Sequence, residues 1–279
     1  MKVFIVLLMI AAVAFADAFS DGVAAFKRGD LPEAVRYMTQ AIKQNPSNAL
    51  AYFNRGYMYA MLDEHSKAIE DYTQAINIDP NNAEARPSNA EIYDSRGVSH
   101  AALGDYKMAI EDFTQAIKID SKDADIYFNR GNSYQNIGDY PKAIADYTHA
   151  IKLEPKPREA YNARGVSYQN LDDHKKAIAD FTRAIEIRPY LKYAEAHYNR
   201  GVSYRKLRDH TKAIEDFTQA IEIEPESAIF YHDRGYSYAD IKEFKKAVQD
   251  AKKACELGDC ILSQRLDENG WIEQRRKQQ

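Results

Sequence analysis

The sequence is poor in cysteine, tryptophan and glycine, and it carries no excess of basic charge. Its 279 residues include 2 Cys, 1 Trp and 12 Gly. Two cysteines are too few for a disulfide-built scaffold or for a zinc site made of four thiolates. A formal net charge of −4 gives no electrostatic footprint for nucleic acid. With 45% hydrophobic and 29% charged residues, the composition is that of a folded, soluble protein.

An uncharged apolar run occupies residues 3–16, directly after Met1 and Lys2. As a helix it would span roughly 21 Å, which is short of the ~30 Å hydrocarbon core of a bilayer. Small residues near Ala16 and Ala18 suit a cleavage site, so residues 1–16 are interpreted as a signal peptide. This predicts an exported protein, periplasmic or secreted, with no stable membrane span after cleavage. A buried N-terminal helix and an uncleaved membrane anchor are the alternatives.

A repeat of about 34 residues runs through the rest of the chain. It is marked by seven glycines whose spacings are 34, 41, 34, 34, 36 and 34 residues. Alanines stand 12 and 19 residues after each glycine, and prolines close five of the units. Internal periodicity of this length is typical of solenoids. The marking glycines are Gly22, Gly56, Gly97, Gly131, Gly165, Gly201 and Gly235.

Each unit has the pattern of two amphipathic helices joined by a tight turn. In one unit, Ile126, Tyr127 and Tyr134 recur at helical spacing before the turn at Gly138, and a second helical pattern ends before Pro155. No strand-like alternation occurs, so the chain is predicted to be all-α. Glycine inside a helix costs about 1 kcal/mol relative to alanine, so the glycine column predicts a close approach of two helices. The apolar face of one helix pair must then be covered by neighbouring pairs.

The period and the Gly…Tyr…Ala…aromatic…Ala…Pro columns resemble the tetratricopeptide repeat (TPR) family. The resemblance implies an α-solenoid, a right-handed superhelix of helix-turn-helix units whose first helices line a concave groove. The expected units are residues 17–48 (a weak first repeat), 49–82, 90–123, 124–157, 158–191, 194–227 and 228–259. Residues 83–89 form an insertion in which Pro87 should interrupt any continuous helix. A capping helix over 260–272, covered by Trp271 and Ile272, and a basic tail over 273–279 complete the chain.

A column of arginines directly precedes six of the seven glycines, and an aspartate follows each arginine after 16 residues. Such an arginine row could bind phosphate or acidic peptides. The matching aspartates favour structural ion pairs between the two helices of each unit instead. The pairs are Arg55–Asp71, Arg96–Asp112, Arg130–Asp146, Arg164–Asp180, Arg200–Asp216 and Arg234–Asp250.

Amides and aromatics dominate the positions two and three before each glycine and one, four and five after it. Asparagine offers two donors and an acceptor, which suits pairing with a peptide backbone, whereas a merely solvated helix face favours Glu and Lys. A solvated face is the alternative interpretation for any single position. The candidate groove residues are Phe53, Asn54, Tyr57, Phe128, Asn129, Asn132, Gln135, Asn136, Asn162, Gln169, Asn170, Tyr198, Asn199, Arg205 and Tyr236.

Some members of the family grip a C-terminal carboxylate through paired Lys and Asn. Asn54, Asn129 and Asn199 match one Asn of that clamp, but the Lys expected three residues before the leading glycine is absent from every unit. Chaperone-tail binding of that kind is therefore not expected.

Cys255 and Cys260 lie five residues apart at the end of the last unit. In an oxidising compartment they would form a local disulfide that staples the C-terminal cap, and two buried free thiols are the alternative. No redox or haem motif of the CxxC type is present. The seven histidines include no i, i+4 pair for a metal, and no G-x-S-x-G, P-loop or dinucleotide fingerprint occurs.

These observations predict a non-enzymatic scaffold or adaptor that binds a protein or peptide segment in its groove, with no cofactor, metal or nucleic acid. The protein would be a monomer or a weak homo-oligomer. The alternative function is structural: self-association through the edge repeats to organise an envelope assembly.

Overall fold

The computed structural model describes residues 18–80, 87–153, 158–187 and 193–268. These residues form two compact units, the N-terminal unit up to Asp139 and the C-terminal unit from Tyr140 onward. Within the described ranges all regular structure is helical and no strand occurs, so the predicted all-α class is confirmed. The predicted signal peptide, Trp271, Ile272 and the basic tail lie outside the described residues.

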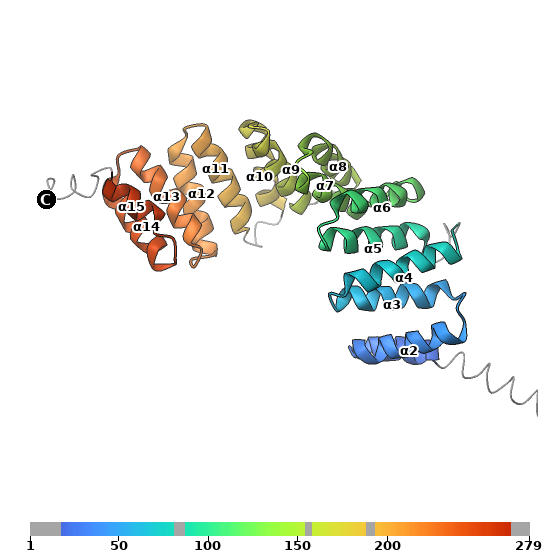
Figure 1. Ribbon diagram of the computed structural model, residues 1–279. Helices are drawn as coiled ribbons and strands as arrows, with labels where there is room; N and C mark the ends of the chain where they lie inside the picture. Colours follow the sequence, from blue (N-terminus) through green and yellow to red (C-terminus); the bar gives the residue numbers. More distant parts are fainter. Residues whose placement is uncertain (1–17, 81–86, 154–157, 188–192, 269–279) are drawn as a thin grey trace, which may run out of the picture. The chain divides into compact units, whose positions relative to one another are not determined.

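The N-terminal unit is a stack of antiparallel helices (Figure 1). Residues 18–27 are helical and precede the first labelled helix. The labelled helices are α2 (Leu31–Gln44), α3 (Ala49–Met61), α4 (His65–Ile78), α5 (Asn89–Ala102), α6 (Tyr106–Ile119) and α7 (Ala124–Asn136).

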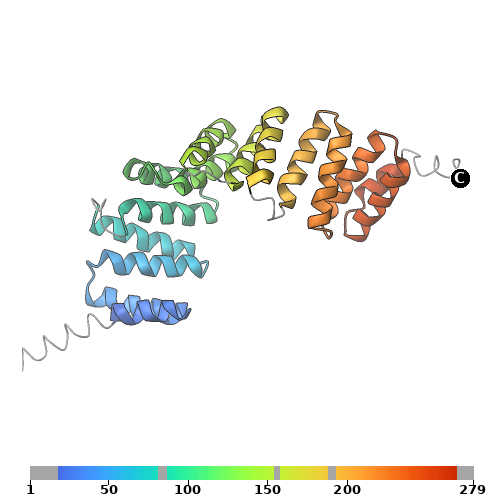
Figure 2. The same cartoon turned by 180° about the vertical axis from the view of Figure 1, so that it is seen from behind.

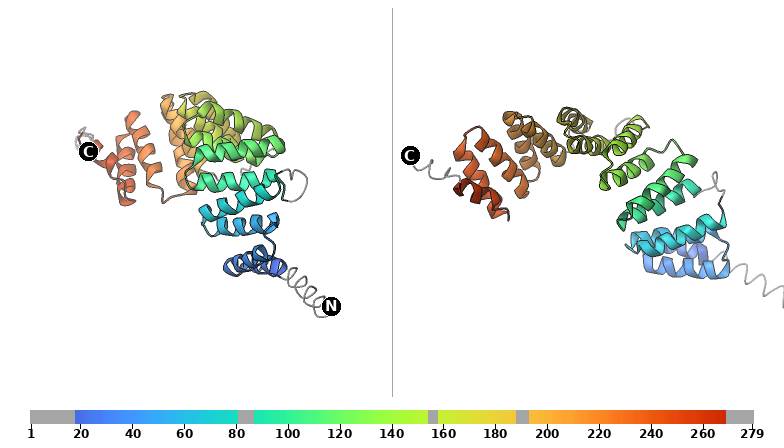
Figure 3. Two further views of the ribbon diagram at one scale, coloured as in Figure 1. Left: turned by 45° about the vertical axis from the view of Figure 1, so that its right-hand side comes forward. Right: turned by 45° about the horizontal axis from the view of Figure 1, so that its top comes forward.

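The C-terminal unit repeats the same arrangement, as Figures 2 and 3 show from other sides. Its helices are α8 (Tyr140–Leu153), α9 (Arg158–Asn170), α10 (His174–Ile187), α11 (Ala194–Lys206), α12 (His210–Ile223), α13 (Ala228–Asp240), α14 (Phe244–Glu256) and α15 (Ile261–Glu268). In each unit a helix packs mainly against the next helix along the chain, and more sparsely against the next but one. This is the neighbour-by-neighbour packing of a solenoid. Across the described ranges, no helix is both long and apolar enough to span a bilayer.

The glycine column allows an aromatic ring to fill the space between the two helices of a pair. An added Cβ would lie only 2.6–2.8 Å from a ring carbon of the residue 16 positions later, which is closer than van der Waals contact permits. The rings themselves are fully buried. The close approach predicted for the glycines is therefore present, and the pairs in which it is closest are Gly97–Phe113, Gly165–Phe181 and Gly201–Phe217.

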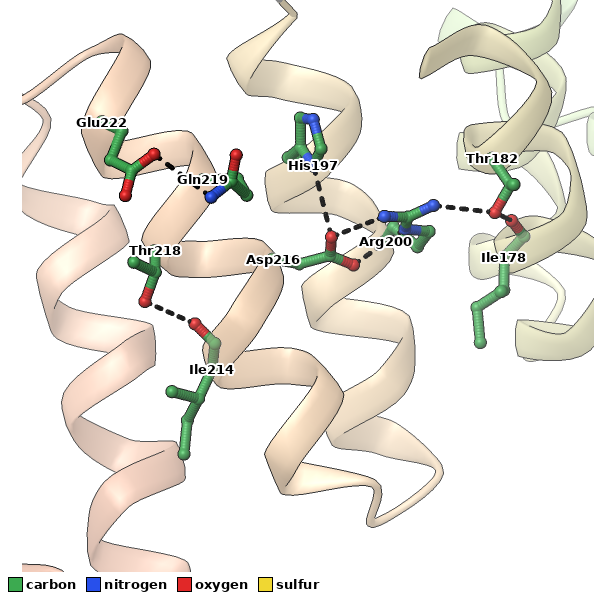
Figure 4. Close-up of polar contacts among 9 residues, drawn as sticks. All are labelled: Ile178, Thr182, His197, Arg200, Ile214, Asp216, Thr218, Gln219 and Glu222. Atoms are coloured by element: carbon green, nitrogen blue, oxygen red, sulfur yellow. Dashed lines mark hydrogen bonds and ion pairs between the residues drawn. The ribbon is translucent and has the colours of Figure 1, made fainter. Parts of the chain in front are cut away.

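The arginine column forms structural ion pairs, as predicted. In the C-terminal unit, the guanidinium of Arg200 donates to both oxygens of Asp216, at 2.8 and 2.7 Å (Figure 4). Its remaining nitrogen donates to Thr182 Oγ1 at 3.0 Å, on the second helix of the preceding repeat. The same three-helix bond set recurs as Arg55–Asp71–Thr39, Arg96–Asp112–Thr73, Arg164–Asp180–Thr148 and Arg234–Asp250–Thr218.

The turn after each first helix needs one residue in the left-handed region. Gly29, Gly104 and Gly138 occupy it with φ near +80°. In the other repeats non-glycine residues take the same conformation, among them Arg208 at +65°. The insertion ends in an ordinary helix start, because Ser88 and Glu91 form a reciprocal capping box at the first turn of α5, just after Pro87.

The last repeat is closed by α15. The second helix of the last repeat, α14, has Ala251 at the position where the second to sixth repeats carry an aromatic ring. Leu262 of α15 fills that space against Gly235. Leu262 and Leu266 are buried. Cys255 of α14 and Cys260, directly before α15, form a disulfide.

Removal of the disulfide in the variant Cys255→Ser/Cys260→Ser is expected to lower the free energy of unfolding by about 2 kcal/mol, because so small a ring constrains little chain entropy. The loss of stability should be confined to the C-terminal end of the unit. Amide hydrogen exchange should quicken in α15 while α9 to α12 keep their protection. Faster exchange throughout the C-terminal unit would contradict this account of the cap. An unchanged exchange rate in α15 would contradict it as well.

Candidate functional site

All fifteen candidate groove residues lie on first helices of the hairpins: α3, α7, α9, α11 and α13. Their exposure differs. Tyr57, Asn136 and Asn170 are exposed, Asn162 is buried, and the remaining eleven are half-buried. A continuous row of exposed amides is therefore not what the structure presents.

The amides tie neighbouring first helices to one another. Asn129 Nδ2 donates to Asp94 Oδ1 at 3.3 Å and thereby joins α7 to α5. Gln169 Nε2 lies 2.8 Å from both the carbonyl oxygen of Asn199 and Ser203 Oγ, which joins α9 to α11. These donors serve the spacing between repeats, a role that the sequence analysis did not predict.

Two further amides bridge α9 and α11, and two fold back on their own helices. Asn162 donates to Glu195 Oε1 at 3.0 Å and accepts from Asn199 at 3.4 Å. The exposed Asn136 and Asn170 each donate to the carbonyl oxygen four residues earlier, at 2.9 Å.

Two candidate residues of α11, Tyr198 and Arg205, form a charged cluster with Asp233 of α13. Tyr198 donates to Asp233 Oδ2 at 2.8 Å, and Arg205 forms an ion pair with Oδ1 at 3.1 Å. Burial raises the pKa of Tyr198, and the charge of Asp233 raises it further. The ring of Tyr236 packs on His232, with centroids 4.9 Å apart. Arg205 is thus already neutralised by a carboxylate of its own unit.

A groove opens in the N-terminal unit between α3 and α5, with a volume of about 720 Å³. We call it the N-terminal groove. It brings together the three candidate residues of α3. A carboxylate, Asp94, lies on the facing helix and was not among the candidates. The lining comprises Leu50, Phe53, Asn54, Tyr57, Pro87, Ser88, Ala90, Glu91, Asp94, Ser95, Asp120, Asp123 and Ile126.

Asp94 is the electrostatically unusual member of this lining. Burial raises its pKa to about 6, the hydrogen bond from Asn129 opposes that shift, and the nearby carboxylates Asp123 and Asp125 add to it. A signal for this site was present in the sequence. Asp94 occupies the position three before Gly97, where other repeats carry Phe53, Phe128, Asn162, Tyr198 or His232.

Asp94 should make stability fall as the pH rises. Its pKa is raised from 3.8 to about 6 on folding, so the folded chain retains a proton there that the unfolded chain has lost. The corresponding stability is fully present below pH 3.8 and disappears as the pH rises through about 6. Asp94→Asn is therefore expected to stabilise the protein by about 1–2 kcal/mol at alkaline pH and to leave it unchanged in acid, as measured by urea unfolding. Destabilisation at alkaline pH would show that the ionised carboxylate has a stabilising partner.

The described residues contain no group of three or more His, Cys, Asp or Glu side chains placed to hold a metal ion.

Family models described as tetratricopeptide repeat match most of the chain. They cover residues 21–83, 124–157, 159–191, 194–227 and 228–257, and a model described as TPR repeat covers 97–138.

Similar proteins include a curated relative and two solved structures. Stress-induced-phosphoprotein 1 of Caenorhabditis elegans is 39% identical over 54 residues, which are 19% of this chain and 17% of that protein. The chain thus aligns with about a sixth of that relative's length. YrrB, described as a TPR protein with an unusual peptide-binding site, is 25% identical with a TM-score of 0.59, over 70% of this chain and 96% of YrrB. A repeat protein from Parabacteroides merdae matches in fold alone, at 18% identity and a TM-score of 0.66, over 91% of this chain and 98% of its own.

Proposed function

Because the chain belongs to the tetratricopeptide repeat family, we propose that it is a non-enzymatic scaffold that binds a peptide segment of another protein along its first helices. The observation that carries this proposal is the N-terminal groove. It lies between the first helices of neighbouring repeats, and its walls combine apolar side chains such as Phe53 and Tyr57 with polar ones such as Asn54. Its volume of about 720 Å³ falls within the range of about 300–1,000 Å³ that ligand pockets occupy.

The likeness to YrrB supports binding of a peptide, since that protein is described as having a peptide-binding site.

The chaperone-tail clamp is not part of the proposal. The position of its lysine holds Phe53, Asp94, Phe128, Asn162, Tyr198 and His232 in the second to seventh repeats, so the lysine with which the clamp grips a carboxylate is absent from all six.

Export from the cytoplasm is part of the same proposal. The disulfide between Cys255 and Cys260 supports it, because disulfides persist in oxidising compartments and are rare in the cytosol. The test is to express the chain in its own host, fractionate the cells and sequence the N-terminus of the product. A start at Asp17 or Phe19, directly after Ala16 or Ala18, is expected. A cytosolic product that begins at Met1 would overturn this part.

The function itself is tested by capture of partners from an extract of the host. The wild-type chain is compared with the variant Asn129→Asp/Asn199→Asp, which changes two candidate positions on first helices. The matched control Gln115→Glu/Gln219→Glu introduces the same charge at exposed positions of the second helices α6 and α12. Circular dichroism checks that all three chains are folded.

We expect the control to recover the same proteins as the wild type and the first-helix variant to lose them. Equal recovery by all three chains would contradict binding along the first helices. Light scattering on the purified chain tests the structural alternative, because self-assembly requires oligomers that grow with concentration whereas an adaptor stays monomeric.

A further inference from the structure

The N-terminal groove combines an aromatic wall with an acidic one. Phe53 and Tyr57 of α3 form the first, and Tyr57 keeps 44% of its surface exposed. Glu91 and Asp94 of α5, together with Asp120 and Asp123 from the α6–α7 turn, form the second. No lysine or arginine among the described residues contributes to the lining.

Three of the four carboxylates have a local structural role that fixes them in place. Glu91 accepts from the backbone N–H of Ser88 at 2.7 Å in the capping box. Asp120 and Asp123 each accept a backbone N–H two residues further on, at 2.9 Å. These bonds account for the presence of the three residues, and they fix the positions of three negative charges in the lining of the groove.

Asp94 accepts no backbone N–H from a described residue, and its structural contact is the bond that joins α5 to α7. It lies in the middle of α5 rather than at an end, and its one hydrogen bond from the described residues comes from the neutral amide of Asn129. That bond supplies no positive charge. Burial and the neighbouring carboxylates both disfavour the ionised form.

The C-terminal unit shows what a first-helix carboxylate receives when it is satisfied internally. Asp233 accepts from Tyr198 and pairs with Arg205 at 3.1 Å, so its charge is balanced within the unit. Asp94 forms no ion pair with any described residue.

We propose that the N-terminal groove binds a lysine or arginine side chain of a partner peptide, with the cationic head paired to Asp94 and the alkyl stem lying against Phe53 and Tyr57. This deepens the proposed function and rests on it. The acidic wall is complementary to a cation, and the aromatic wall is complementary to the apolar stem that lysine and arginine carry. A charge-assisted pair with Asp94 would also balance a carboxylate that pairs with no cation in the described part of the chain.

The test is an NMR titration of the ¹⁵N-labelled full chain at neutral pH with four tripeptides. They are acetyl-Leu-Lys-Leu-amide and its counterparts with arginine, norleucine or glutamate at the centre. Norleucine keeps an alkyl stem but lacks the charge. We expect the lysine and arginine peptides to shift amides of α3 and α5 and to bind at least about tenfold more tightly than the norleucine peptide, which corresponds to one charge-assisted pair. The glutamate peptide should bind most weakly.

Two variants assign the roles, and a third serves as the control. Asp94→Asn, nearly isosteric, should bring the lysine and norleucine peptides to within about twofold of each other. Tyr57→Ala should weaken both while the preference for lysine remains. Glu111→Gln removes an exposed carboxylate on α6, outside the groove, and should change nothing. The amide spectrum of each variant reports whether it is folded. Added salt should weaken binding of the lysine peptide more than binding of the norleucine peptide.

Equal affinity of the lysine and norleucine peptides, persistence of the preference in Asp94→Asn, or no shift with any peptide would each overturn the proposal. None of these results would touch the proposed function. That proposal fails separately, if capture of partners is unaffected by the Asn129→Asp/Asn199→Asp changes.

Discussion

Replacement of Asp216 by alanine is expected to lower the free energy of unfolding by about 3–5 kcal/mol, a large share of the stability of an ordinary domain. Asp216 is only 4% exposed and accepts two hydrogen bonds from Arg200. His197 Nδ1 lies 3.2 Å from its Oδ1. Without the carboxylate, the guanidinium of Arg200 stays between three helices with its charge uncompensated. Urea unfolding followed by circular dichroism measures the loss.

The neighbouring bond to Thr182 provides the matched control. Thr182→Val keeps the shape of the side chain. It removes the acceptor for one Arg200 nitrogen and the hydroxyl that donates to the carbonyl oxygen of Ile178, so a loss of about 1–2 kcal/mol is expected. If Asp216→Ala lowered the free energy of unfolding by less than Thr182→Val does, the view that the arginine column stabilises the fold would be contradicted. In that case the arginines would again be candidates for a ligand.

The second large effect is expected at the aromatic ring between α9 and α10. Phe181 has no exposed surface, and its truncation to alanine should cost about 3–5 kcal/mol. The same ring lies against Gly165, where an added Cβ would come within 2.6 Å of Phe181 Cε1. Gly165→Ala should therefore destabilise the wild-type chain by about 1–3 kcal/mol through overpacking.

The two changes should be coupled, and the coupling should reverse the sign of the glycine effect. Once Phe181 is alanine, the three ring atoms that lie nearest to the added Cβ are gone. The substitution Gly165→Ala then gains helix propensity of up to about 1 kcal/mol without the clash against the ring. A double-mutant cycle by urea unfolding measures this. If Gly165→Ala destabilises both backgrounds equally, the glycine column does not exist to accommodate the ring.

The sequence was sufficient for the fold because each repeat carries its own packing information. The glycine at 165, the ring at 181 and the Arg164–Asp180 pair all lie within one hairpin, at separations of 16 residues. Because the glycine–ring and Arg–Asp pairs recur with the period of the repeat, they can be recognised from a single sequence. The acceptor threonines recur in the same way, but Thr148 belongs to the repeat before Arg164, so only the stacking of repeats reveals it.

The candidate site was harder to predict because it depends on distances between repeats. Gln169 and Asn199 were predicted to offer amides to a ligand, whereas Gln169 uses its amide to bond α11. Asp94 was not among the candidates because amides and aromatics, rather than carboxylates, were the residue types expected to bind a peptide. Its significance comes from what faces it: the amide of Asn129 and the aromatic wall of α3, with no cation from the described residues.

Deletion of residues 158–193 tests most directly the claim that each hairpin is covered only by its neighbours. This removes α9 and α10 together with the connection to α11, and it places Ala194 where Arg158 began a helix after α8. Gly201 then takes the register of Gly165, and Arg200 can reach Thr148 as Arg164 does. The shortened chain should keep its helicity per residue in circular dichroism and unfold at a lower urea concentration. A chain that is unfolded or aggregated in the absence of urea would show that the missing hairpin is required by parts of the protein it does not adjoin.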